Sequence, residues 1–223
     1  MNREVPVREA LLAEQAYDRL VAVLRDGTVA AGQFLSMPGL VELLDLPLAA
    51  TREAVKRADT NGLVKVLPKR GVLVMDASAK ATRDCMDLRS LLDREGARRL
   101  IAARSELPLA ALRASHEALI EDAERAMTPE LPRRAILTDL SLHDALSTGL
   151  DNPLAASAYR VNRDRIAVVQ NTRPFLPDRI VPAMHEHLAI IGALGRRDAE
   201  EAVAAIEAHY RTTLRWWGIL VEP

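Results

Sequence analysis

The sequence lacks several features that would assign a protein to a membrane, a secreted or a disulfide-bonded class. It has no run of the roughly 18 consecutive apolar residues that a membrane span needs, and no apolar segment behind its charged N-terminus that could act as a signal peptide. Its single cysteine, Cys85, cannot form an internal disulfide, and nothing around it suggests a nucleophilic triad. We therefore expect a cytoplasmic protein with no membrane partner, in which Cys85 serves as a small apolar residue.

Aromatic residues are also scarce, at 3%, but the 223-residue chain is 49% hydrophobic and can build a core. Alanine, leucine and arginine dominate, which favours helices, and the length suits two domains. The net charge of −1 hides a local excess: between Thr51 and Gly71, six basic residues face only two acidic ones, a net charge of +4. Positive charge is thus concentrated as a DNA contact requires, although a solvated helix face followed by a charged turn is the alternative.

The N-terminal third predicts three helices followed by a hairpin. Apolar residues at helical spacing, a stop at Gly27, a Ser36 cap and a break at Asn61-Gly62 delimit the helices. Two short apolar strands then flank the turn Pro68-Lys69-Arg70-Gly71. The expected helices cover residues 12–26, 36–44 and 48–60, and the expected strands 63–67 and 72–75. This order is that of a winged helix-turn-helix, whose third helix enters the major groove while the hairpin tip meets the DNA backbone or minor groove.

This part of the chain resembles the N-terminal DNA-binding domain of GntR-family transcriptional regulators. The resemblance rests on Tyr17, Leu20, Gly27, Gly32, Leu35, Thr51-Arg52-Glu53-Ala54-Val55, Gly62-Leu63-Val64 and Lys69-Arg70-Gly71-Val72-Leu73-Val74. It implies that operator DNA is bound by Arg52, Lys56, Lys69, Arg70 and Gly71. The family pattern Ser-Arg-Thr-Pro-Val-Arg-Glu is replaced by a segment that begins Pro47-Leu48, and a leucine cannot bond a guanine edge or a phosphate.

After a short polar stretch at residues 76–81, which reads as a linker, the rest of the chain predicts six helices separated by Pro, Gly or polar breaks. Their expected bounds are 82–103, 108–127, 131–148, 153–172, 178–194 and 198–217. Asp198, followed by Glu201, has the spacing of a capping box at the start of the last helix. The predicted fold is mainly α, a winged helix-turn-helix followed by an all-helical bundle.

Four polar side chains interrupt the apolar stripes of three of these helices. Asp139 and His143 lie four residues apart on one face, and His187 and His209 occupy core-facing positions of the last two helices. An oxygen and three nitrogens directed at one interior suit Zn²⁺, and also Ni²⁺, Mn²⁺ or Fe²⁺. The alternative is a set of hydrogen-bonded core histidines. His116 and His185 fall off the apolar stripes, and we interpret both as surface residues.

The same four residues resemble the metal site of the FadR C-terminal, or FCD, effector domain. The resemblance to that domain also includes Asp87-Leu88-Arg89-Ser90-Leu91-Leu92 at its start and Glu186-His187-Leu188-Ala189-Ile190-Ile191 near its end. The resemblance implies a DNA-binding domain at residues 1–76 and a metal-binding, dimerising effector domain at 82–223, with the six helices of the VanR-like subgroup. It also implies that the metal supports binding of a small organic acid and that Arg89 helps to hold it. The alternative for Arg89 is a surface ion pair with Asp93 or Asp87.

Asn162 interrupts another apolar stripe, so it either faces the effector pocket or is an ordinary exposed amide. The function predicted from these features is a homodimeric transcriptional regulator, expected to be a repressor, whose DNA affinity responds to a carboxylate-bearing metabolite. A metal-dependent enzyme is the competing class, since an open coordination position can activate water, but only Glu186 presents itself as a nearby acid or base. The third hypothesis is a metal site that only stabilises the fold.

Overall fold

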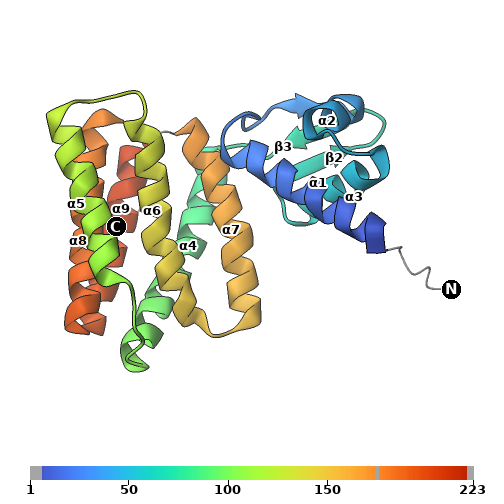
Figure 1. Ribbon diagram of the computed structural model, residues 1–223. Helices are drawn as coiled ribbons and strands as arrows, with labels where there is room; N and C mark the ends of the chain where they lie inside the picture. Colours follow the sequence, from blue (N-terminus) through green and yellow to red (C-terminus); the bar gives the residue numbers. More distant parts are fainter. Residues whose placement is uncertain (1–6, 174–175, 220–223) are drawn as a thin grey trace. The chain divides into compact units, whose positions relative to one another are not determined.

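The computed structural model describes residues 7–173 and 176–219 (Figure 1). The chain divides into two compact units, which we describe separately: one runs up to Ala81 and includes Asp164–Thr172, and the other comprises the remaining residues from Thr82 onward. Helices dominate and the only sheet among the described residues is small, so the predicted fold class is confirmed. Within the described ranges, no helix is both long and apolar enough to cross a membrane.

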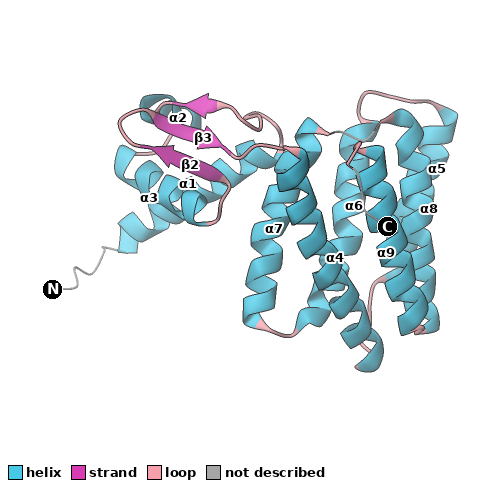
Figure 2. Cartoon of the chain, turned by 180° about the vertical axis from the view of Figure 1, so that it is seen from behind, coloured by secondary structure: helices cyan, strands magenta, loops and turns pink. Residues whose placement is uncertain are grey.

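The first unit consists of three helices and a three-stranded antiparallel sheet, coloured by type in Figure 2. The helices are α1 (Val7–Arg25), α2 (Met37–Leu44) and α3 (Leu48–Thr60), and the strands are β1 (Phe34–Leu35), β2 (Val64–Leu67) and β3 (Gly71–Val74). The predicted cap is present, because the Ser36 hydroxyl accepts a hydrogen bond from the backbone N–H of Gly39 at 3.1 Å.

The strand β1 was not predicted. It pairs with β3, with Phe34 opposite Leu73, so that the strand order is β1-β3-β2. Two residues are too few to display the alternating pattern by which a strand is recognised in a sequence. Its effect is to give the hairpin a third strand and to cover one edge of β3.

The turn between β2 and β3 depends on glycine. Lys69 has a left-handed φ of 60° and Gly71 a φ of 141°, and a methyl group on Gly71 would overlap the backbone carbonyl oxygen of Leu35. The Arg70 N–H donates to the Leu67 carbonyl at 3.0 Å and closes the turn. The side chains of Lys69 and Arg70 are consequently presented at an exposed tip.

Polar contacts hold α3 against its neighbours. The Asn61 amide donates to the Tyr17 hydroxyl of α1 at 2.7 Å, and the Arg57 guanidinium lies 3.8 Å from the centroid of the same ring while it pairs with Glu14. On the other side, the Asp59 carboxylate accepts the N–H of Val66 in β2 at 2.9 Å. These contacts orient α3 so that Arg52, Glu53 and Lys56 face solvent, whereas Thr51 is buried.

The second unit is a helical bundle. Its helices are α4 (Ala79–Ala102), α5 (Leu109–Arg125), α6 (Leu131–Ser147), α7 (Pro153–Thr172), α8 (Pro177–Arg196) and α9 (Ala199–Trp216), with a 3-10 turn at Thr148–Leu150; the last nine residues of α7 group with the first unit. Helix α4 begins three residues earlier than expected, inside the segment that we interpreted as a linker. The Asp198 carboxylate caps α9 by accepting the Glu201 N–H at 2.9 Å, as predicted.

Buried leucine, isoleucine and alanine side chains fill the bundle, and α8 packs between α5 and α9. Figure 1 shows α5 and α8 lying side by side. Cys85 is buried and forms no disulfide within the described residues, in agreement with its interpretation as a small apolar residue.

Helices α4 and α6 approach each other closely at Gly96. A methyl group there would overlap the carbonyl oxygen of Leu146, and a methyl group on Gly149 would overlap the carbonyl oxygen of Gly96. The backbones therefore touch with no side chain between them. Asp93 and Arg89 lie one and two turns before Gly96 on α4 and contact His143 and Asp139 of α6. The close contact at Gly96 therefore helps to set the distance between these side chains.

We expect Gly96→Ala to lower the free energy of unfolding by about 1–3 kcal/mol or more, because backbone atoms on both sides would have to move. Gly195→Ala is the matched control: the nearest atom that its methyl group would meet is Leu109 Cδ1 at 3.8 Å, and alanine in a helix stabilises by roughly 0.5–1 kcal/mol. Denaturant titrations of both variants measure the two values. Equal stability of the two variants would contradict the close packing at Gly96.

Candidate metal centre

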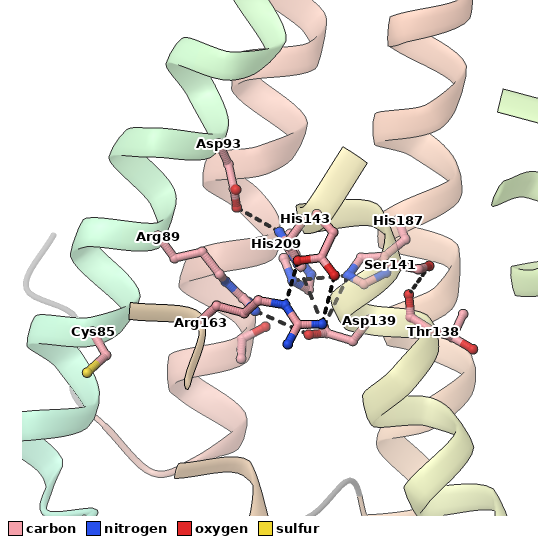
Figure 3. Close-up of polar contacts among 12 residues, drawn as sticks. Cys85, Arg89, Asp93, Thr138, Asp139, Ser141, His143, Arg163, His187 and His209 are labelled. Carbon is pink, nitrogen blue, oxygen red and sulfur yellow. Dashed lines mark hydrogen bonds and ion pairs between the residues drawn. The ribbon is translucent and has the colours of Figure 1, made fainter. Parts of the chain in front are cut away.

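Four buried side chains from three helices meet inside the second unit (Figure 3). Asp139 and His143 project from α6, His187 from α8 and His209 from α9, and one potential ligand atom of each lies within 4.8 Å of all the others. The structure thus brings together the four residues that the sequence singled out. Their spacing on apolar stripes explains the convergence, since each occupies a core-facing position of its helix.

The nitrogens and oxygens of this cluster face one another without forming a satisfied hydrogen-bond network. His187 Nε2 lies 3.2 Å from His209 Nε2 and 3.4 Å from Asp139 Oδ1. His143 Nε2 is buried and has no hydrogen-bond partner among the described residues; its separation from Asp139 Oδ1 is 3.8 Å. A buried, unsatisfied ring nitrogen is costly unless something else occupies the space in front of it. The four residues therefore fit a divalent metal ion.

The outer nitrogen of each of the three imidazoles is held by a different partner. His143 Nδ1 lies 2.7 Å from Asp93 Oδ2, and His209 Nδ1 lies 2.7 Å from Glu186 Oε2. His187 Nδ1 lies 3.0 Å from Nε2 of His116 on α5. Metal-binding histidines ordinarily engage their second nitrogen in this way, which leaves the Nε2 lone pairs directed at the centre.

Glu186 is itself tightly held. Both of its oxygens accept hydrogen bonds from Arg179 at 2.6 Å, and Arg179, which is buried, also donates to the Thr213 hydroxyl at 3.2 Å. With one oxygen also bound to His209, Glu186 orients a ring and is not free to act as a general base. The sequence suggested Glu186 only as a possible acid or base and gave no sign of this pairing.

Arg89 is buried and lies beside the cluster, so the alternative prediction of a surface ion pair is wrong. Its Nη1 donates to Asp139 Oδ2 at 3.2 Å, whereas Asp139 Oδ1 faces the histidines. One carboxylate thus joins the guanidinium to the candidate metal position. The expected alternative partners, Asp93 and Asp87, instead bind His143 and Tyr210.

The protonation states of Asp139, His187 and His209 suit metal binding. His143 differs: burial and Arg89 lower its pKa, but Asp93 and Asp139 outweigh them and raise the pKa above its ordinary value. Burial by itself raises the pKa of the Asp139 carboxyl, but Arg89 and the nearby imidazoles outweigh it and hold that pKa well below its usual range. Burial lowers the pKa of His187 well below its ordinary value and that of His209 below it. Asp139 is therefore ionised and these two rings are neutral near pH 7, as ligation requires.

Asn162 is buried on α7, so the reading of an exposed amide is wrong. Its amide nitrogen donates to the Cys85 carbonyl at 2.8 Å, and its Oδ1 has no hydrogen-bond partner in the part of the chain that the structure describes. Within the same ranges, Asp93 Oδ1 is also buried without a hydrogen-bond partner. The wall formed by α4 and α7 therefore offers unsatisfied polar atoms in addition to Arg89.

His116 is completely buried, which contradicts its interpretation as a surface residue; His185 is exposed, as expected. The signal was present in the sequence. Leu112, His116, Leu119 and Ile120 follow the three-and-four spacing of a core stripe on α5, and all four are buried. The His116 ring lies between Leu112 and His187 rather than in the group of four.

The residues predicted to contact DNA lie in the first unit. Arg52 and Lys56 are exposed on successive turns of one face of α3, Lys69 and Arg70 are exposed at the hairpin tip, and Gly71 begins β3. Leu48, the first residue of α3, is 43% exposed, so it does not serve the core of this unit. Helix α3 carries no side-chain cap at its N-terminus.

Comparison with known proteins agrees with this architecture. The family described as the FCD domain matches residues 84–212, more than half of the chain. The Uxu operon transcriptional regulator of Escherichia coli (strain K12) is 25% identical in an alignment 224 positions long, which covers 91% of this chain and 87% of that protein.

Two solved structures share the fold along almost the whole chain. E. coli McbR/YncC superposes with a TM-score of 0.71 at 17% identity, covering 93% of this chain and 97% of its own. A Rhodococcus sp. RHA1 protein described as a GntR transcriptional regulator gives a TM-score of 0.76 at 18% identity, covering 94% of this chain and 99% of its own.

Proposed function

Because this chain belongs to the FCD-domain family of GntR-type transcriptional regulators and is not an enzyme, we propose that it couples operator binding to the sensing of a small molecule. Residues 1–76 would bind the DNA. Residues 82–223 would bind a divalent metal ion together with a small carboxylate, and occupancy of that site would change the affinity for the operator. The single observation that carries the sensing role is the buried Arg89, which shares Asp139 with the histidine cluster.

The proposed metal ligands are one oxygen of Asp139 and the Nε2 atoms of His143, His187 and His209. Three imidazoles and one carboxylate suit zinc best, and nickel, manganese or iron are accommodated by the same donors. The metal would supply a positive centre with a free coordination position to which an organic acid can bind. The unpartnered Nε2 of His143 supports this assignment.

The proposed effector contacts are Arg89 and Asn162. Arg89 has five N–H donors, of which one bonds Asp139, so others remain for an incoming carboxylate. Asn162 would accept a hydrogen bond through its unsatisfied Oδ1. An anion held by Arg89 would also lie near the metal, because only the Asp139 carboxylate stands between Arg89 and the metal position.

The proposed DNA contacts are Arg52 and Lys56 on α3 and Lys69, Arg70 and Gly71 at the hairpin tip. Their exposure and shared positive charge support the assignment, and the uncapped first turn of α3 leaves backbone N–H groups for a phosphate. We further propose that the protein acts as a homodimeric repressor of the VanR-like subgroup. Two copies would place two recognition helices on two half-sites, and the six helices in the described part of the second unit agree with the subgroup.

The test of the sensing role is Arg89→Ala. A panel of metabolite carboxylates is added to the zinc-loaded protein, and we expect at least one to raise its melting temperature. In Arg89→Ala the affinity for that carboxylate, measured by calorimetry, should fall by about 1.5–3 kcal/mol because a charge-assisted hydrogen bond is lost. The zinc content of the variant should stay near that of the wild type.

Arg196→Ala is the matched control, since it removes the same charge from an exposed position on α8 that pairs only with Glu201 among the contacts described. Its carboxylate affinity should equal that of the wild type. If Arg89→Ala retains full affinity as well, Arg89 does not bind the effector. If no carboxylate binds the zinc-loaded wild type, the sensing role is refuted.

A further inference from the structure

His116 of α5 is a fourth buried histidine next to the metal centre, although it is not one of the four candidate ligands. Its ring has no exposed surface, its Nδ1 lies 2.7 Å from the carbonyl oxygen of Leu112, and its Nε2 lies 3.0 Å from His187 Nδ1. The two rings meet edge to face, with their centroids 5.2 Å apart. His116 thus joins a backbone carbonyl to the outer nitrogen of a candidate ligand.

If both rings are neutral, the 2.7 Å contact of His116 Nδ1 with the Leu112 carbonyl determines the donors and acceptors along this chain of contacts. The Ser115 hydroxyl lies farther from the same nitrogen, at 3.4 Å, and itself donates to Leu112 at 2.8 Å. A carbonyl oxygen only accepts hydrogen bonds, so His116 Nδ1 must carry the proton and donate it to Leu112. The Nε2 of a neutral His116 is then an acceptor, and His187 Nδ1 must donate to it. His187 Nε2 is left with a lone pair, directed at Asp139 and His209.

From this arrangement we propose that His116 is a positioning residue that keeps the proton of His187 on Nδ1 and directs the Nε2 lone pair at the metal. The inference rests on the proposed metal site and names a residue that site requires beyond its ligands. The Nδ1 atoms of His143 and His209 are hydrogen-bonded to the carboxylates of Asp93 and Glu186, whereas that of His187 is hydrogen-bonded to a neutral ring. Helix α5, which supplies no ligand, thereby becomes part of the metal centre.

His116→Leu removes the acceptor while keeping an apolar side chain in the core. His187 Nδ1–H would then be buried without a partner, and the tautomer with the proton on Nε2 would compete with metal binding. Loss of such an outer contact typically weakens metal affinity 10–100-fold, and we expect a loss in that range for zinc, measured by chelator competition. His116→Gln, whose side chain can accept from His187 and donate to Leu112, should recover most of the affinity.

Leu119→Ala is the matched control for damage to α5. Leu119 is almost completely buried on the same helix, so its truncation should destabilise the fold while leaving the zinc affinity of the folded protein unchanged. His116 would be only a core residue if His116→Leu and Leu119→Ala both kept wild-type zinc affinity. An equal loss in His116→Leu and His116→Gln would also overturn the proposal, because the acceptor would then be irrelevant.

A second measurement does not depend on any variant folding. In zinc-free wild-type protein, nitrogen-15 NMR of the histidine rings should show the proton of His187 on Nδ1 and no proton on Nε2. A protonated Nε2 would contradict the proposal. The two ideas fail in different ways: if wild-type protein binds no divalent ion, the proposed metal site fails, whereas wild-type zinc binding that is insensitive to His116→Leu refutes only the role of His116.

Discussion

Replacing His187 by alanine should abolish the dependence of the protein's thermal stability on divalent metal. A ligand that binds only the native state stabilises it by RT ln(1 + [metal]/Kd), about 3–4 kcal/mol when the free metal is 100–1,000 times Kd. For a chain of this size that corresponds to a difference in melting temperature of roughly 5–16 °C between zinc-loaded and chelated wild type. Because His187 contributes one of four ligands, the variant should melt at the same temperature in both conditions, and metal analysis should show little bound ion.

The control is His185→Ala, two residues away on α8 and exposed. It should keep the full metal dependence and one ion per chain. His209→Ala should behave like His187→Ala, because both rings lie in the buried cluster. Equal metal content in the His185 and His187 variants would show that the cluster is an ordinary set of core histidines.

The second large effect concerns DNA. Removing Lys69 or Arg70 should weaken binding to every duplex and reduce the slope of log affinity against log salt by roughly 0.9 per lost phosphate contact. Arg52, one turn into α3, can reach a guanine edge with two hydrogen bonds, so Arg52→Ala should cost about 1–3 kcal/mol per half-site and relax the preference at one operator position. Titrations of one operator and one scrambled duplex at several salt concentrations separate the two kinds of contact.

Arg57→Ala is the matched control within α3. It removes the same charge, but Arg57 pairs with Glu14 and stacks on Tyr17, and so it faces α1. Its salt slope should match that of the wild type. If the Arg57 variant lost as much affinity as the Arg52 and Arg70 variants, the DNA contact would depend on overall charge rather than on the proposed face.

The helices and the four clustered residues could be predicted because both leave a local pattern. A core-facing position repeats every three or four residues, so a polar residue on that stripe is visibly out of place, as at His187 and His209. The same test, applied to Leu112, His116 and Leu119, would have placed His116 in the core. Its misassignment was an error of pattern reading and not a limit of the sequence.

Other parts of the site leave no such pattern. The pairs Asp93–His143 and Glu186–His209 join residues on different helices, and only the packing of the bundle brings them together. The close approach of α4 to α6 at Gly96 could not be predicted from the sequence either, because a glycine inside a helix indicates only a low helix propensity. The short strand β1 could not be predicted because two residues are too few to show the alternation of apolar and polar residues that indicates a strand.

Native mass spectrometry of gently purified protein, with and without an operator duplex, measures subunit number, metal, effector and DNA binding together. We expect two chains per particle, one divalent ion per chain, a mass increment for a bound organic acid that disappears in Arg89→Ala, and a complex of this dimer with the duplex. The proposed metal site is refuted if the wild type carries no divalent ion after equilibration with zinc, or if the His187→Ala variant keeps its ion.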